Sequence, residues 1–168
     1  MEHVWTVLCR RAITDRETNQ TSLIDSIEGL TATISAEKVK EAERDNKRIG
    51  VEVGAVLVSF WVRSDLKIPE MGEMRTRVVA PDGSVVSRED AKASVNLRDN
   101  RRMRMHLEIP ALPFAGEGQY WFVTEMLRDE QWLLVSRVPC EMNLQDAESE
   151  IEKQAPPPGS PKKKTSKR

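Results

Sequence analysis

Short segments in which apolar and polar residues alternate recur along most of the chain. The clearest runs from Arg102 to Ile109 (RMRMHLEI), where odd-numbered positions are apolar and even-numbered positions are polar. Successive side chains of a β-strand point to opposite faces, so this period of two predicts a strand with one face in a core and the other in water. We expect Met103 and Met105 to point inward, and Arg102 and Arg104 to point outward.

Other segments predict strands that are more deeply buried. Residues 51–63 and 119–127 are nearly continuous in apolar side chains and rich in β-branched and aromatic residues, which is typical of strands covered on both faces. Further strands are expected at 4–10, 21–34 with a bend near Gly29, 73–80, 85–88, 91–96 and 132–138.

The residues between these segments favour turns and loops. Pro81-Asp82-Gly83 predicts a hairpin turn, residues 128–131 connect a second hairpin, and the prolines and glycines of 110–118 predict a loop. About seven or eight strands at this spacing favour a single antiparallel β-sandwich, either immunoglobulin-like or C2-like. Its core is expected to contain Val53, Leu57, Met103, Leu107, Phe122 and Val135.

Three parts of the chain depart from the strand pattern. Residues 35–48 are charged and predict a helical or looped insert within a sandwich domain of residues 1–142. Residues 143–153 predict a short acidic helix capped by Asn143. Residues 154–168 predict a disordered tail, because they combine four prolines with five cationic side chains. Those cationic residues are Lys162, Lys163, Lys164, Lys167 and Arg168.

Charge and cysteine content bear on compartment and partners. The 168 residues carry a formal net charge of −1, so no global field draws the protein to nucleic acid or membranes. The chain has no apolar run long enough to span a bilayer and no export signal, which predicts a cytoplasmic protein. Cys9 and Cys140 are expected to be buried free thiols, with a disulfide as the alternative.

Candidate chemistry is sparse. With two histidines and two cysteines, three-His and paired-Cys zinc sites are excluded by count, and the chain has neither a Gly-x-Ser-x-Gly motif nor a phosphate-binding glycine loop. Asp15, Glu17 and Asn19 alternate in a loop that loosely resembles the calcium-binding loops of sandwich domains but lacks the spacing and the glycine of an EF-hand. We therefore expect no catalytic residues, no cofactor and no metal site, with a small hydrolase or calcium-dependent domain as a distant alternative.

Arginines form the most prominent polar pattern. Arg75 and Arg77 share one face of a predicted strand, as do Arg102 and Arg104, so neighbouring strands would place four guanidinium groups on one surface for a phosphate or acidic partner. The alternative is that acids such as Glu73 and Glu108 pair with these arginines across strands. The basic tail from Lys162 to Arg168 has the composition of a weak polyanion-binding segment.

Several motifs resemble those of a known family. These motifs are the segments VWTVLC at 4–9 and TSLID at 21–25, the polar turn at 15–19, the Pro81-Asp82-Gly83 turn and the strand GQYWF at 118–122. Together they resemble a bacterial family of small β-sandwich domains that is catalogued only as a domain of unknown function. The resemblance covers about residues 4–142. It implies a sandwich fold and a bacterial cytosolic setting, and no activity or site residues.

These patterns favour a non-catalytic binding or interaction module. A protein is the expected partner. The alternative is an accessory protein that contacts nucleic acid or another polyanion weakly through the arginines and the tail.

Overall fold

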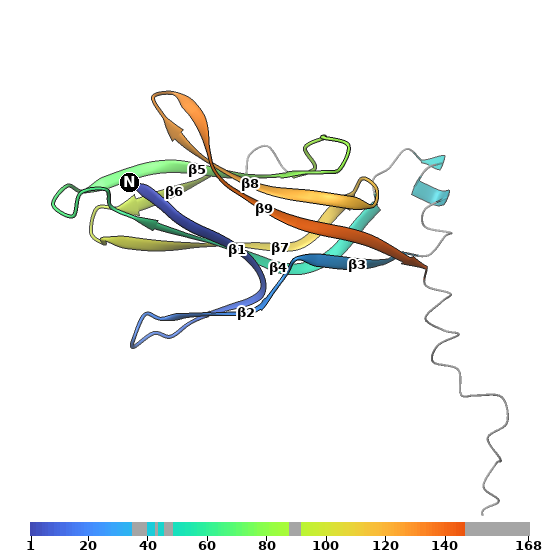
Figure 1. Ribbon diagram of the computed structural model, residues 1–168, viewed down its shortest axis with the longest axis horizontal. Coiled ribbons are helices and arrows are strands. Elements are labelled where there is room, and N and C mark those ends of the chain that lie inside the picture. The colour runs from blue at the N-terminus through green and yellow to red at the C-terminus, as the bar shows by residue number, and fades with distance from the viewer. Residues whose placement is uncertain (35–39, 43, 46–48, 88–91, 147–168) are drawn as a thin grey trace, which may run out of the picture.

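The computed structural model describes residues 1–34, 40–42, 44–45, 49–87 and 92–146. Within these residues nine strands form two sheets that pack face to face (Figure 1). The strands are β1 (Glu2–Thr14), β2 (Thr21–Ser26), β3 (Gly29–Ile34), β4 (Ile49–Val62), β5 (Glu70–Val79), β6 (Lys92–Leu97), β7 (Arg102–Phe114), β8 (Gly118–Arg128) and β9 (Gln131–Asp146).

The sheets differ in size and composition. One has four strands in the order β2-β1-β4-β7, and the other has five in the order β3-β9-β8-β5-β6. Strand pairs in the described part of the chain are antiparallel except β3–β9, which is parallel. The prediction of an all-β sandwich is confirmed, with nine strands rather than seven or eight and with one parallel pair.

The bend expected near Gly29 carries the chain from one sheet to the other. Residues 21–34 form two strands, of which β2 pairs with β1 and β3 pairs with β9. The backbone between them stays bonded, because Ile27 donates to the carbonyl of Leu8 at 2.9 Å and Glu28 accepts from Glu141 at 2.9 Å. The single bent strand predicted at residues 21–34 is therefore two strands, one in each sheet.

Two sequence predictions of non-strand structure are wrong. Residues 110–114 continue β7 instead of forming a loop, because β7 is an edge strand, where a proline without an N–H is tolerated. Residues 143–146 continue β9 instead of starting an acidic helix. They pair with β3, from Thr31 opposite Asn143 to Ile34 opposite Asp146, and this pairing satisfies backbone groups that a helix would have to satisfy internally.

The charged insert and the tail lie largely beyond the described residues. Within 35–48, residues 40–42 and 44 are helical, and the side chains of Lys40, Glu41 and Arg44 are exposed. The remainder of the insert, residues 147–153 of the predicted helix, and the tail with its five cationic residues are outside the part of the chain that the structure describes.

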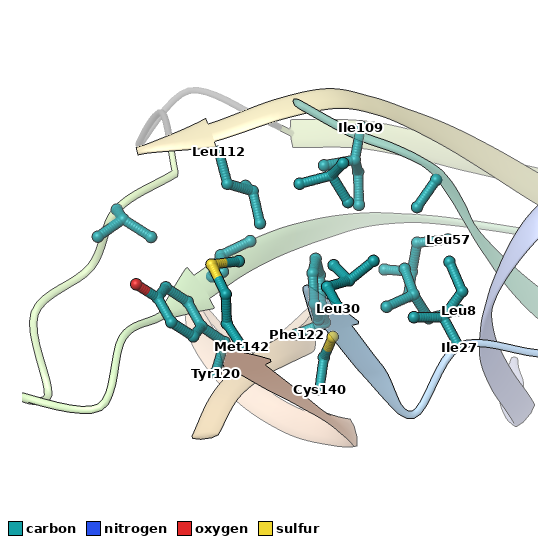
Figure 2. Packing of buried hydrophobic residues seen from close by; sticks show 14 of the residues in the cluster. Leu8, Ile27, Leu30, Leu57, Ile109, Leu112, Tyr120, Phe122, Cys140 and Met142 are labelled. Atoms are coloured by element: carbon teal, nitrogen blue, oxygen red, sulfur yellow. The ribbon is translucent and has the colours of Figure 1, made fainter. Parts of the chain in front are cut away.

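The core consists of two apolar clusters between the sheets. The first contains Leu8, Leu57, Tyr120, Phe122 and Met142 among others, and its side chains interdigitate between the two layers (Figure 2). The second is built around Trp61, Met74, Val95, Leu97 and Met126. Both sheets therefore contribute to each cluster.

Most of the predicted core residues are confirmed. Val53, Leu57 and Phe122 are fully buried, while Met103 and Val135 are half-buried and pack against the second cluster. Leu107 was predicted to be in the core, but its side chain is 37% exposed. It lies opposite Leu57 on edge strand β7 and lines a cavity that remains open between the sheets.

A layer of buried hydroxyl side chains separates the two clusters. On β4, β5 and β8 one small polar residue lies between an inward side chain of the first cluster and one of the second. We call these residues the hydroxyl layer. They are Ser59, Thr76 and Thr124, and they are 2%, 3% and 0% exposed.

The two cysteines are free thiols, as predicted, and both are buried. Burial raises the pKa of Cys140 to about 11 and also raises the pKa of Cys9 above its ordinary value. Both sulfur atoms therefore stay protonated at neutral pH and are weak nucleophiles.

The turn between β8 and β9 carries local strain. Asp129 and Glu130 form a two-residue connection in which both have positive φ, at 49° and 63°. Since glycine adopts this conformation without steric cost, Glu130→Gly is expected to raise the free energy of unfolding by about 0.5–1 kcal/mol. Urea unfolding measures this change. Glu73→Gly, at an exposed strand position, should lower stability instead, and a loss of stability in Glu130→Gly would contradict the account.

Candidate binding surface on the five-stranded sheet

The four arginines singled out from the sequence do not share one surface. Arg75 and Arg77 lie on β5 of the five-stranded sheet, whereas Arg102 and Arg104 lie on β7 of the four-stranded sheet. The prediction of a single face with four guanidinium groups is wrong, because it required β5 and β7 to be neighbouring strands of one sheet. Each pair has its own surroundings.

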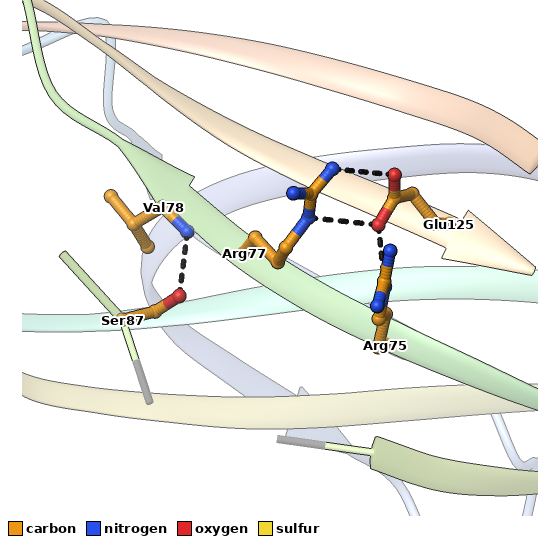
Figure 3. Close-up of polar contacts among 5 residues, drawn as sticks. All are labelled: Arg75, Arg77, Val78, Ser87 and Glu125. Carbon is orange, nitrogen blue, oxygen red and sulfur yellow. Dashed lines mark hydrogen bonds and ion pairs between the residues drawn. The ribbon is translucent and has the colours of Figure 1, made fainter. Parts of the chain in front are cut away.

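Arg75 and Arg77 converge on one carboxylate, that of Glu125 on β8 (Figure 3). Arg75 Nε donates to Glu125 Oε2 at 2.6 Å, and Arg77 bonds both oxygens, with Nε at 2.9 Å from Oε2 and Nη2 at 2.6 Å from Oε1. Glu125 is only 7% exposed, while both arginines are half-buried. The cross-strand pairing that the sequence offered as an alternative therefore occurs here, through an acid other than Glu73 or Glu108.

Two opposing effects set the ionisation of Glu125. Burial by itself raises the pKa of this carboxyl, because it disfavours the charged form. The hydrogen bonds and positive charges of Arg75 and Arg77 outweigh that effect and hold the pKa of Glu125 below its ordinary value. The carboxylate is thus ionised at neutral pH and fixes the positions of two guanidinium groups.

Glu125→Gln is expected to lower the free energy of unfolding by about 1–2 kcal/mol at neutral pH, since it weakens charge-assisted hydrogen bonds to partly exposed arginines. Because the folded pKa is depressed, the contribution of Glu125 is present above the unfolded pKa of about 4.3 and is lost as pH falls through the folded value. Urea unfolding at a series of pH values should therefore show a steeper acid loss in the unmodified protein than in the variant. Identical slopes would contradict this pairing.

Two tryptophans on the same face hold cationic side chains. The guanidinium carbon of Arg75 lies 4.4 Å from the ring centroid of Trp132, and the Lys92 ammonium lies 5.6 Å from that centroid. The guanidinium carbon of Arg137 lies over Trp121, 3.7 Å from the ring centroid. We call this surface the tryptophan–arginine face. It comprises Arg75, Arg77, Lys92, Trp121, Glu125, Trp132 and Arg137.

A β-bulge explains why the sequence pattern did not reveal this face. Trp132 and Arg137 are five positions apart, so strict alternation places them on opposite sides of β9. The pairing of β8 with β9 shifts between Thr124 and Glu125, and this irregularity brings Trp132 opposite Leu127 and Arg137 opposite Val123 on one side. The face could be found only with that register known.

The second arginine pair lies on the four-stranded sheet. The guanidinium carbon of Arg104 lies 5.1 Å from the centroid of the Phe60 ring, and Arg104 Nη1 donates to the carbonyl of Asn19 at 3.1 Å. A hollow of about 510 Å³ lies beside it, lined by residues that include Arg102, His106 and Asn100. Arg104 thus links β7 to the turn between β1 and β2, whereas Arg102 is exposed.

In the loop that loosely resembles calcium-binding loops, the carboxylate of Asp15 holds the turn together through hydrogen bonds. Asp15 Oδ1 accepts hydrogen bonds from the backbone N–H groups of Glu17 and Thr18 and from the Thr18 hydroxyl, at 2.7–2.9 Å. These bonds hold the pKa of Asp15 below its ordinary value. Among the described residues, no three His, Cys, Asp or Glu side chains are grouped to hold a metal ion.

Known proteins add no assignment to this geometry. No protein-family model matches the chain, and no curated protein matches it in sequence. The resemblance to the bacterial sandwich family therefore stays a prediction. In the part of the chain that the structure describes, no helix has the length and apolar character needed to cross a membrane.

Proposed function

We propose that the protein is a non-catalytic binding module that docks an acidic, partly apolar segment of a partner protein on the tryptophan–arginine face. The observation that carries the proposal is the placement of Arg137. Its guanidinium lies over Trp121, and it makes no ion pair with any acid among the described residues. A cationic group held in place but left without a counter-charge is suited to an acidic ligand.

The composition of the face supports a protein partner. Tryptophan and arginine are the residues most enriched among those that dominate binding energy at protein interfaces. The residues of this face include four cations and one acid, Glu125, so their summed charge is positive although the chain as a whole is slightly acidic. Leu134, opposite Glu125 on β9, is 61% exposed and offers an apolar contact next to the charges.

The arrangement is ordered before any partner binds. Glu125 holds two arginines, and the tryptophan rings support Arg75, Lys92 and Arg137. Long cationic side chains otherwise lose rotamer freedom on binding, and this pre-organisation lowers that cost. Trp132 pairs with Leu127 of β8, so its position along the sheet is six residues from Trp121. Six residues of a strand span ~20 Å, which is the length of an extended peptide segment of about six residues.

Nucleic acid is the alternative partner, since arginines and the basic tail could contact phosphates. The mixture of exposed leucine, two tryptophans and a buried glutamate favours a partner with both acidic and apolar side chains. Salt separates the two alternatives, because binding to nucleic acid through several phosphates weakens steeply as salt concentration rises.

The test is a calorimetric titration of the full chain with a synthetic peptide rich in Asp, Glu and Leu. We expect saturable binding that Arg137→Ala weakens about tenfold or more, since a charge-assisted contact is lost. Arg102→Ala, on the other sheet, is the matched control and should bind as the unmodified chain does. A peptide with Asn and Gln in place of the acids should not bind.

Two results would overturn the proposal. One is equal weakening by Arg137→Ala and Arg102→Ala, which would show general electrostatic attraction without a defined face. The other is tighter binding of a short DNA duplex than of the acidic peptide, with a steep dependence on salt, which would favour the nucleic-acid alternative.

A further inference from the structure

Strand β7 has a long free edge. It lies at one end of the four-stranded sheet and pairs only with β4 in the part of the chain that the structure describes. It has 13 residues, whereas the other edge strands, β2, β3 and β6, have six each. Apart from the pairing with β4, no backbone hydrogen bond joins positions 102–109 to another described residue. Such an edge presents unpaired N–H and C=O groups to an added strand.

The prolines of β7 restrict an added strand to the first part of this edge. Pro110 and Pro113 lack N–H groups, and prolines on an edge strand are a common protection against strand addition. Residues 102–109 contain neither proline nor glycine. The second part of the edge is therefore protected, and the first part is able to pair.

The inward side chains of this first part are incompletely covered. Leu107 is 37% exposed, and Met103 and Met105 are half-buried beside the second cluster. Met105 and Leu107 also line the cavity that remains open between the sheets. Because β7 is an edge strand, these side chains have a neighbouring strand on one side only. An added strand with apolar residues at alternate positions would cover them, and that burial is favourable.

Two charged side chains on the outward side of β7 have no ion-pair partner among the described residues. They are Arg102 and Glu108, and both are exposed. Arg104 lies between them and is already held by the carbonyl of Asn19. The segment thus has an unpaired cation near its start and an unpaired anion near its end. Charges in this order are complementary to the same segment running in the opposite direction.

We infer that a second copy of this chain pairs with this edge, antiparallel, through residues 102–108 of both copies and with Met105 at the two-fold axis. In this register Arg102 lies opposite the partner's Glu108, and by symmetry Glu108 lies opposite the partner's Arg102. Opposite charges that face each other across an antiparallel pair stabilise it. The two four-stranded sheets would then form one continuous sheet.

The inward side chains and the neighbouring registers favour the same alignment. Met103 lies opposite the partner's Leu107, so the side chain that edge position leaves exposed gains an apolar neighbour. A register centred on Arg104 would place two arginines opposite each other, which is destabilising. A register centred on His106 would pair Glu108 with Arg104, whose guanidinium already bonds to the Asn19 carbonyl, and would leave Arg102 unpaired.

This pairing does not involve the tryptophan–arginine face, which lies on the outer side of the other sheet. The two proposals therefore stand or fall separately. Arg102→Ala changes a contact between copies and no residue of that face, so it remains a control for peptide binding.

The test is sedimentation equilibrium of the full chain over a series of concentrations. We expect a monomer–dimer equilibrium that Arg102→Glu and Glu108→Arg each weaken about tenfold or more, because one reversal creates two like-charge pairs in a symmetric dimer. The double variant restores both opposite-charge pairs and should dimerise as the unmodified chain does. An equimolar mixture of the two single variants should also form dimers, by the same pairing.

Arg11→Glu and Glu28→Arg are the matched controls, since they reverse exposed charges outside β7. Neither should change dimerisation, and circular dichroism checks that all variants are folded. A monomer at every concentration overturns the inference. So does a dimer that the β7 reversals weaken no more than the controls do, or one that the double variant fails to recover.

Discussion

Replacing Phe122 with alanine is expected to lower the free energy of unfolding by about 3–5 kcal/mol. Phe122 is fully buried in the first cluster, on strand β8, which pairs with β5 and β9 on its two sides. It lies opposite Val78 on one neighbour and Val138 on the other, so the ring is enclosed by its own sheet as well as by the opposite one. The close-packed surroundings can fill only part of the space that alanine would leave.

Urea unfolding followed by circular dichroism measures this loss. Phe60→Ala is the matched control, because Phe60 is half-buried and contacts Trp5 and Arg104 on the outer face of the four-stranded sheet. The loss of unfolding free energy in Phe60→Ala should be clearly smaller than in Phe122→Ala. Equal losses in the two variants would contradict the assignment of Phe122 to the centre of the core.

Trp61→Ala is expected to produce a loss of similar size, about 3–5 kcal/mol, in the second cluster. The indole is fully buried, its Nε1 donates to Ser59 Oγ at 2.9 Å, and its ring meets His3 edge-on at 5.0 Å between centroids. Alanine removes the largest apolar side chain of the cluster and also leaves the Ser59 hydroxyl without its donor.

Thermal and urea unfolding by circular dichroism test this expectation without relying on tryptophan fluorescence. Trp61→Phe should retain a large part of the stability, because it keeps an aromatic ring and loses the hydrogen bond and some volume. Trp132→Ala, on the half-exposed outer face, serves as the second control. A loss in Trp61→Ala no larger than in Trp132→Ala would contradict the packing described for the second cluster.

Alternation along single strands was sufficient to predict the fold class and much of the core. It placed Met103 and Met105 correctly against the interior. It could not predict the exposure of Leu107, because burial depends on whether the opposite sheet covers that point of an edge strand. The same limit applies to Pro110 and Pro113, which are tolerated in β7 because this strand lies at the edge of its sheet.

The binding surface was less accessible to sequence reasoning. Arg75 and Arg77 were found because they alternate on one strand, but their carboxylate partner lies on β8, far along the chain. Arg137 and Trp132 reach the same side only through the bulge in the β8–β9 pairing. Pairing partners and bulges depend on tertiary contacts, so a pattern of residues within one strand does not specify them.

The central claim is that the tryptophan–arginine face is the binding surface, and the four tryptophan indole N–H signals in a nitrogen-15 NMR spectrum test it most directly. On titration with the acidic leucine-containing peptide, the signals of Trp121 and Trp132 should shift together and saturate. Trp61, which is buried, and Trp5, which lies on the other sheet, should keep their positions. Shifts confined to Trp5, or no shift of Trp121 and Trp132 at saturating peptide, would contradict the claim.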